Sequence, residues 1–277
     1  MTQLTRKVAI ATILLCASAS AQVDVSRTKL WAKFVADSIG GNDGDAVALW
    51  DNLQGTADRD LLQSVAIDKP TLKTNIINGH AVVRFDGVTE YMDGTNDNTG
   101  MGEADLYVIV RVVTDPPLLI GQSGWMYMLA SSTITESAHF PYISGSIYES
   151  FRRFHTRVNF NPTPALTTFR LYSVHAATNK YTIRIDTTTV YNDASAFTPD
   201  ASNGGYQVGR SSQAYFLDGD IAELRIYVPK LSDAQRDTVY YNFDIKYNLG
   251  YDPPIGIGEL SVGRNRRCSC ITLSGGR

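Results

Sequence analysis

Apolar and polar residues alternate along much of this chain in short runs, as they do in strands with one buried face. Ala81, Val83 and Phe85 alternate with more polar neighbours, and this period of two indicates a half-buried strand. Asp86-Gly87 follows and predicts a turn, because glycine adopts positive φ without a Cβ clash and aspartate can hydrogen-bond its own backbone. We expect a β-hairpin or a bend between two paired strands here.

Residues 106–113 form a nearly continuous apolar run rich in β-branched side chains, which predicts a strand covered on both faces. Pro116-Pro117 ends it, because proline has no N–H to donate to a neighbouring strand. Further strands, between turns rich in Gly, Pro, Asn and Asp, are predicted at residues 47–50, 124–130, 151–160, 167–175, 181–185, 206–209 and 221–228. Many short strands separated by such turns are typical of a β-sandwich or a barrel.

One helix is predicted close to the C-terminus. Ser232 can cap its first turn, and Gln235 stands three residues later to complete a capping box. Apolar residues then recur at a spacing of four from Val239 to Tyr247, as they do on the buried face of a helix. The helix should run over residues 233–247.

Residues 1–21 have the three-part plan of a secretory signal peptide: a basic pair, an apolar run over 8–16 and small residues at 19–21. The apolar run is too short to span a bilayer as a helix. We therefore predict a secreted or cell-surface protein, with one domain over residues 22–252. Residues 253–277 are predicted to be a linker and a basic, disordered tail. An uncleaved N-terminus would instead favour a virion protein.

Charge and cysteine content narrow the classes of partner. The chain carries 25 basic and 28 acidic side chains, a formal net charge of −3, which argues against a nucleic-acid partner because nucleic acids attract basic surfaces. The three cysteines, Cys16, Cys268 and Cys270, all lie outside the predicted domain, so no disulfide is expected in its core. Cys268-Ser-Cys270 has no matching Cys or His pair to complete a zinc site.

Two sequence blocks together resemble a known family. The first comprises residues 69–72 and 78–92, and the second comprises residues 206–210, 216–227 and 231–236. The chain is similar to the concanavalin A-like lectin/glucanase superfamily, and within it to the laminin G-like jelly-roll domains of bacterial secreted and phage proteins. The resemblance implies an all-β fold: an antiparallel two-sheet jelly-roll sandwich with one C-terminal α-helix. It carries over no shared active site.

One strand invites comparison with an enzyme. Laminarinase-type glycoside hydrolases share this broad fold and use a Glu-x-Asp-x-x-Glu strand, and Asp218, Asp220 and Glu223 stand at that spacing here. The first position is one methylene shorter than glutamate, and a regular strand would direct Asp220 and Glu223 to opposite faces unless a bulge intervenes. Retaining chemistry needs two carboxyl groups close together. We therefore interpret these residues as an ordinary strand and predict that the chain is not an enzyme.

The acidic loop over residues 93–105 is a candidate calcium site. Calcium prefers carboxylate, amide and carbonyl oxygens on a bending chain, and Asp93 and Asp97 are the predicted ligands in this loop. The loop lacks the fixed spacing of a calcium-binding motif, so a solvated acidic loop remains the alternative. The shorter acidic run at residues 42–45 is a weaker candidate of the same kind.

A second candidate site lies in residues 140–160, where aromatic residues stand among arginines. Tyr142, Tyr148, Arg152 and Arg153 are predicted to bind a ligand, because aromatic faces stack on sugar rings and arginine binds carboxylate or sulfate through two hydrogen bonds. The alternative is a strand whose aromatic residues face the core while its arginines face solvent.

The histidines have no partners nearby in the sequence that would indicate a metal site or a catalytic triad. We expect His139, His155 and His175 to be structural.

These observations predict a secreted, non-enzymatic module that binds a carbohydrate or another surface glycoconjugate, with calcium as its one candidate cofactor. The alternative from another class is a structural or adhesion component of a cell surface or virion that uses the sandwich as a packing unit. A glycoside hydrolase is the third option. No nucleic-acid partner and no membrane-spanning segment are expected.

Overall fold

The computed structural model describes residues 27–55, 59–94, 101–113, 124–129, 135–139, 146–153, 157–195, 197–199, 206–210 and 216–251. The predicted signal peptide (1–21), the predicted linker and tail (253–277) and all three cysteines lie outside these residues, and those predictions stand as predictions. Short 3₁₀ turns accompany the strands: η1 (Arg27–Lys29), η2 (Ala36–Ser38) and η4 (Ala66–Asp68).

The first sheet is built from the longer strands. Its order is β14–β13–β12–β7–β16–β5–β4, and β1 pairs with the second half of β16 beside β5. Every pairing in it is antiparallel. The strands are β1 (Leu30–Val35), β4 (Thr71–Ile77), β5 (His80–Asp86), β7 (Ala104–Val112), β12 (Arg170–Ala177), β13 (Lys180–Ile185), β14 (Thr188–Asp193) and β16 (Asp218–Tyr227).

The second sheet is built from shorter strands, in the order β11–β10–β9–β8–β15–β6–β3–β2. Its pairings are antiparallel as well. The strands are β2 (Leu49–Trp50), β3 (Leu61–Leu62), β6 (Met92–Gly94), β8 (Gly124–Leu129), β9 (Thr135–His139), β10 (Ile147–Glu149), β11 (Val158–Phe160) and β15 (Tyr206–Val208).

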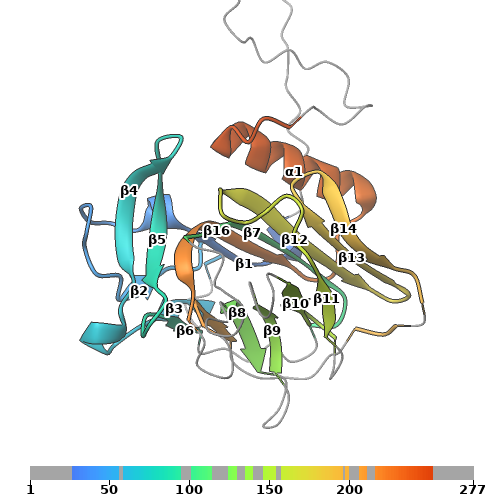
Figure 1. The fold of residues 1–277 in the computed structure, drawn as a ribbon, viewed down its shortest axis with the longest axis horizontal. Helices are drawn as coiled ribbons and strands as arrows, with labels where there is room; N and C mark the ends of the chain where they lie inside the picture. The colour runs from blue at the N-terminus through green and yellow to red at the C-terminus, as the bar shows by residue number, and fades with distance from the viewer. Residues whose placement is uncertain are drawn as a thin grey trace, which may run out of the picture. The chain divides into compact units, whose positions relative to one another are not determined.

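The core lies between the two sheets, and the central strand β7 shows how its sequence builds it. Leu106, Val108 and Val110 are fully buried in a cluster that also takes side chains from both sheets. The alternate residues Tyr107 and Ile109 face the other way and pack in a second cluster with the helix α1 (Asp233–Tyr247). Figure 1 shows α1 lying along this outer face of the first sheet. The predicted strand with both faces covered is therefore confirmed, as is the all-β antiparallel sandwich with a C-terminal helix.

The helix begins and ends where the sequence predicts. The Ser232 side chain accepts a hydrogen bond from the Gln235 backbone N–H at 3.3 Å, and the Gln235 side chain accepts one from the Ser232 N–H at 3.0 Å. These two bonds form the predicted capping box. Asn248 ends the helix in the left-handed conformation at φ 49°.

The turn at Asp86-Gly87 is a bend between the sheets. β5 belongs to the first sheet and β6 to the second, so the two strands that flank this turn do not pair. The turn itself is confirmed, but the prediction that it joins two paired strands, as a hairpin or as a bend, is wrong. The Asp86 side chain accepts hydrogen bonds from the backbone N–H groups of Val88, Thr89 and Glu90 at 2.8–3.0 Å. These bonds hold the chain as it crosses from one sheet to the other.

The strand predicted over residues 151–160 is only partly present. Phe151 and Arg152 form a turn, and among the described residues of this range the strand comprises Val158–Phe160. Arg152 adopts positive φ, 56°, a conformation that a regular strand does not contain. The run of aromatic residues and arginines that indicated one strand here is therefore broken by this turn.

Candidate functional site

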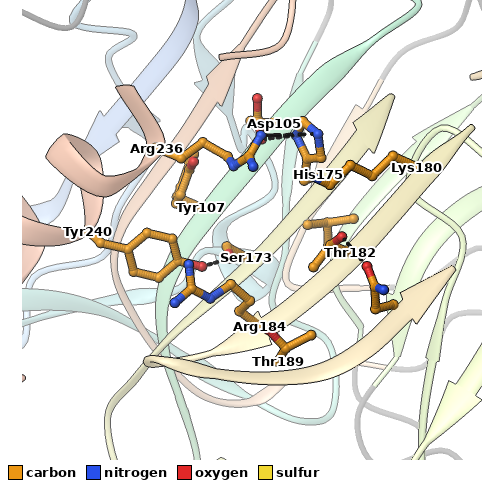
Figure 2. A pocket seen from close by; sticks show the side chains of 12 residues that line it. Asp105, Tyr107, Ser173, His175, Lys180, Thr182, Arg184, Thr189, Arg236 and Tyr240 are labelled. Atoms are coloured by element: carbon orange, nitrogen blue, oxygen red, sulfur yellow. Dashed lines mark hydrogen bonds and ion pairs between the residues drawn. The ribbon is translucent and has the colours of Figure 1, made fainter. Parts of the chain in front are cut away.

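A cavity of about 380 Å³ opens on the outer face of the first sheet beside α1. Four strands and the helix contribute to its wall, and Figure 2 shows their side chains converging on it. We call it the α1 cavity. Its lining residues are Asp105 and Tyr107 from β7, Ser173, Val174 and His175 from β12, Lys180, Thr182 and Arg184 from β13, Thr189 and Asn192 from β14, and Arg236 and Tyr240 from α1.

Strand alternation places these polar side chains on one face. On β13, Tyr181, Ile183 and Ile185 are fully buried in the core between the sheets. Lys180, Thr182 and Arg184 therefore project from the opposite face, and they line the α1 cavity. β12 contributes Ser173 and His175 by the same alternation.

An acid and a histidine form one wall of the cavity. Asp105 and His175 lie opposite each other on β7 and β12, and an Asp105 Oδ1 atom lies 2.7 Å from His175 Nδ1. The second Asp105 oxygen accepts the Leu231 backbone N–H at 2.6 Å. Arg236 Nη1 lies 3.1 Å from each ring nitrogen of His175. The carboxylate fixes the orientation of the ring, and the guanidinium holds the ring from the helix side.

Tyr240 forms the helix wall. Its hydroxyl shares a short hydrogen bond with the Ser173 hydroxyl, drawn dashed in Figure 2. Burial raises the pKa of Tyr240 to about 12, so the phenol stays protonated at neutral pH. The Arg184 guanidinium lies over the Tyr240 ring, 4.4 Å from its centroid, in a cation–π contact.

Three of the four ligand-binding residues predicted from the sequence are described, and they lie outside this cavity. Tyr142 is outside the described residues. Tyr148 is half-buried, with the Arg157 guanidinium 5.4 Å from its ring centroid. Arg152 is fully buried, and Arg153 lies 4.8 Å from the ring centroids of two aromatic side chains, Tyr181 and Phe197. Tyr148, Arg152 and Arg153 are absent from the lining of the α1 cavity. Their role in ligand binding stays a prediction.

Of the two predicted calcium ligands, Asp93 is described, and it does not line this cavity. Asp97 lies outside the described residues, and the Asp93 carboxylate accepts a hydrogen bond from Gln207 Nε2 at 2.5 Å. Glu103, from the same acidic run, binds the Lys230 ammonium at 3.0 Å. Among the described residues no group of three or more His, Cys, Asp or Glu side chains is arranged to hold a metal ion. Calcium binding stays a prediction.

The carboxylates of β16 share one face of the sheet, contrary to the expectation from a regular strand. The pairing register between β16 and β7 shifts between Ile221 and Glu223, which is a β-bulge. Asp220 consequently lies opposite Arg111 and Glu223 opposite Ile109, two positions on the same side of β7. The bulge thus brings both carboxylates to the outer face.

Both carboxylates are engaged by the protein itself. Asp220 and Glu223 are fully buried. Their donors are Arg84 and Arg111 for Asp220, and Arg225, Lys246 and Tyr247 for Glu223. Burial raises the pKa of Glu223, but Arg225 and Lys246 outweigh it and hold that pKa below its usual range. Glu223 is therefore held in its ionised form, and cationic side chains of the fold pair with both carboxylates.

The sequence contains a local signal for the α1 cavity, although it predicts no site there. Ser173 and His175, and likewise Lys180, Thr182 and Arg184, alternate with apolar residues, which already places each set on one strand face. The contact that joins His175 to Asp105 spans 70 residues. Such a pairing depends on the order of strands in the sheet, which the local pattern does not specify.

No family model and no curated protein matches the sequence. The receptor-binding domain of botulinum neurotoxin D is similar in structure, with a TM-score of 0.53 at 7% identity over 78% of this chain and 53% of that chain. A GH54 α-L-arabinofuranosidase gives 0.53 at 14% identity over 73% and 51%. A Trypanosoma rangeli sialidase gives 0.46 at 14% identity over 80% and 34%. The chain spans about a third to a half of these structures. The toxin domain and the arabinofuranosidase share its β-sandwich fold.

The comparisons correct one prediction. The chain was predicted not to be an enzyme, partly because the fold pointed to a binding module. A glycoside hydrolase shares this fold over 73% of the chain, so that exclusion is wrong. Among the described residues, no helix has the length and apolar character needed to cross a membrane.

Proposed function

We propose that this chain is a carbohydrate-binding β-sandwich of the concanavalin A-like, laminin G-like type, and that it holds its saccharide in the α1 cavity. The observation that carries the proposal is the polar wall of that cavity. Hydroxyl groups from Ser173, Thr182, Thr189 and Tyr240 line it together with the Asn192 amide. Saccharides present dense arrays of hydroxyl groups, and side chains of this kind bind them through directional hydrogen bonds.

The similar structures support the same class. The arabinofuranosidase was solved with an arabinofuranoside soaked into its crystals, and the toxin domain is a receptor-binding domain. Proteins that recognise saccharides or receptors therefore use this sandwich. Fold similarity supports the proposed class of ligand, and the polar wall of the cavity supports the proposed position.

Export is part of the proposal, because the pattern of residues 1–21 is that of a signal peptide. Calcium is a second component, with Asp93 and Asp97 as the ligands we propose on the basis of their oxygen chemistry. Calorimetric titration of the protein with calcium, before and after treatment with a chelator, tests the metal separately from the saccharide.

A glycan array with the full chain tests the central proposal. We expect specific signals for the wild type that weaken when Tyr240→Phe and Ser173→Ala remove hydroxyl groups from the cavity wall. Tyr148→Ala is the matched comparison for the ligand site predicted from the sequence. Signals that survive the cavity variants and disappear with Tyr148→Ala would move the site to the second sheet, and silence of the wild type would refute carbohydrate binding. Product analysis of each bound saccharide reports cleavage.

One observation favours the alternative of a structural or adhesion component. Of the eight exposed large hydrophobic side chains among the described residues, six lie between residues 49 and 88, and Leu49 and Leu62 are paired across β2 and β3. β2 ends the second sheet, so a second copy of the chain is the partner that this edge would take. Light scattering of the wild type and of Leu62→Ser tests it. A wild-type monomer at high concentration would refute it.

A further inference from the structure

We infer that the α1 cavity selects an acidic saccharide, and that Arg184 binds its carboxylate or sulfate group. The inference rests on the proposed function and adds the charge of the ligand to it. Three cations line the cavity, from Lys180, Arg184 and Arg236, against the single carboxylate of Asp105. That carboxylate is already engaged by His175 and by the Leu231 N–H. The wall therefore carries an excess of positive charge, which an acidic saccharide can neutralise and a neutral one cannot.

Arg184 differs from the other two cations in its partners. Arg236 binds the Asp233 carboxylate at 2.6 Å, and Lys180 lies 4.0 Å from the same group. Arg184 makes no ion pair within the described part of the chain; it donates to the Thr187 carbonyl at 3.2 Å and lies over Tyr240. A guanidinium is planar and offers paired N–H donors that match a carboxylate or sulfate. An acidic ligand supplies the partner that the fold does not.

Two buried polar atoms in the wall point the same way. The Arg184 Nε–H and the Tyr107 hydroxyl are buried and have no hydrogen-bond partner among the described residues. Buried polar groups are nearly always hydrogen-bonded, since leaving one unpaired costs stability. Both residues line the cavity, so a polar ligand that shifts their side chains on binding would give these atoms partners.

The surroundings of Arg184 fit a sugar that carries the charge. Tyr240 supports one face of the guanidinium, which limits how the side chain can turn. Thr182 donates its hydroxyl to the Asn192 side-chain oxygen at 3.0 Å, so the Asn192 amide nitrogen is the group of that side chain left to donate. The acidic group would lie on Arg184, and hydroxyl groups of the same sugar would bind the threonines and Asn192 at its side.

Calorimetric binding with three saccharides tests the inference. The probes are an oligogalacturonate, which carries only carboxylates, a carrageenan oligosaccharide, which carries only sulfate esters, and a neutral agarose oligosaccharide. The wild type should bind at least one acidic probe about tenfold or more tightly than the neutral one, with affinity that falls as salt rises. The two acidic arms show which acidic group the cavity takes.

Variants assign that preference to the cavity. Arg184→Gln should weaken binding of the preferred acidic probe about tenfold or more and leave the neutral probe unchanged. Arg184→Lys, which keeps the charge without the planar fork, should fall between. Lys69→Gln removes the same unit of charge outside the cavity and should have no effect. Lys180→Gln gives a second cavity variant should Arg184→Gln fold poorly.

The outcomes separate the two proposals. Equal binding of acidic and neutral probes, or an unchanged acidic affinity in both cavity variants, would overturn the inference and leave carbohydrate binding intact. If no saccharide binds the wild type, the proposed function fails, and the inference fails with it.

Discussion

Asp105 and His175 lie directly opposite each other on β7 and β12, 2.7 Å apart at their nearest side-chain atoms. Both are buried, and the same carboxylate also accepts the backbone N–H of Leu231. Leu231 immediately precedes Ser232, the cap residue of α1. One acidic side chain therefore orients the histidine in the cavity wall and fixes the chain at the start of the helix.

Removing the charge of Asp105 should weaken both contacts. We expect Asp105→Asn to lower the free energy of unfolding by about 1–3 kcal/mol, because a buried histidine and a backbone N–H lose a charged acceptor. Urea denaturation measures it. Asp218→Asn on the same face is the control: burial and the neighbouring Asp220 raise the pKa of Asp218, so its loss should change stability little. Equal effects of the two variants would contradict the role assigned to Asp105.

The helix cap gives a second test. Ser232→Ala removes the acceptor of the Gln235 N–H and should cost about 1 kcal/mol. Ser232→Asp keeps an acceptor at the same position and should retain most of that stability. Thermal unfolding monitored by circular dichroism compares the three proteins. If alanine and aspartate behaved alike, the capping box would contribute nothing measurable.

The sequence predicted those elements whose signals are local. The capping box and the spacing of Val239, Phe243 and Tyr247 predicted α1, because both signals lie within one stretch of consecutive residues. The apolar run of β7 predicted burial on both faces, which the core and the helix provide. Where the fold depended on long-range pairing, as at Asp86-Gly87, a turn was predicted correctly but not the sheets that it connects.

The candidate site also depends partly on local patterns and partly on long-range packing, and only the local part is predictable from the sequence. The alternation of Thr182 and Arg184 with core residues was readable, but their convergence with Arg236 of α1 depends on how the helix packs across the sheet. The bulge near Glu223 was likewise unpredictable, because a single extra residue in a strand changes which face its carboxylates share without changing the local pattern. A site that depends on strand register or on helix packing can therefore be identified only from the three-dimensional structure.

Glu223 should behave as a structural anchor for α1. Its carboxylate accepts hydrogen bonds from Lys246 and Tyr247, both at 2.8 Å. Removing one charge from a buried ion pair typically costs about 3 kcal/mol, and we expect Glu223→Gln to lose about that much at neutral pH. The control is Glu90→Gln, since burial and Asp86 raise the pKa of Glu90 to about 7 and its charge is unfavourable.

The pH dependence sharpens this test. The pKa of Glu223 is lowered in the folded state, so its stabilisation is present above the ordinary value and is lost as the pH falls through the folded value. The stability difference between wild type and Glu223→Gln, measured by urea denaturation, should therefore shrink on acidification. A difference that stayed constant down to low pH would contradict an ionised Glu223.

Glu149 should give the opposite pH dependence. It is fully buried between the sheets, and burial raises its pKa to about 7 despite hydrogen bonds from Tyr172 and two backbone N–H groups. The folded protein therefore binds a proton that the unfolded chain releases near its ordinary value of 4.5. Its contribution to stability is complete below that value and is lost as the pH rises through about 7.

The variant Glu149→Gln isolates this effect, because glutamine keeps the shape of the side chain and cannot titrate. Relative to this variant, the wild type should lose about 3 kcal/mol of unfolding free energy between pH 4 and pH 8. Urea denaturation of both proteins across that range measures the difference, and subtracting the two curves removes contributions from other titrating groups. Parallel curves would mean that Glu149 has the same pKa in the folded and unfolded states, and that its burial between the sheets is relieved by a contact other than those to Tyr172 and the backbone.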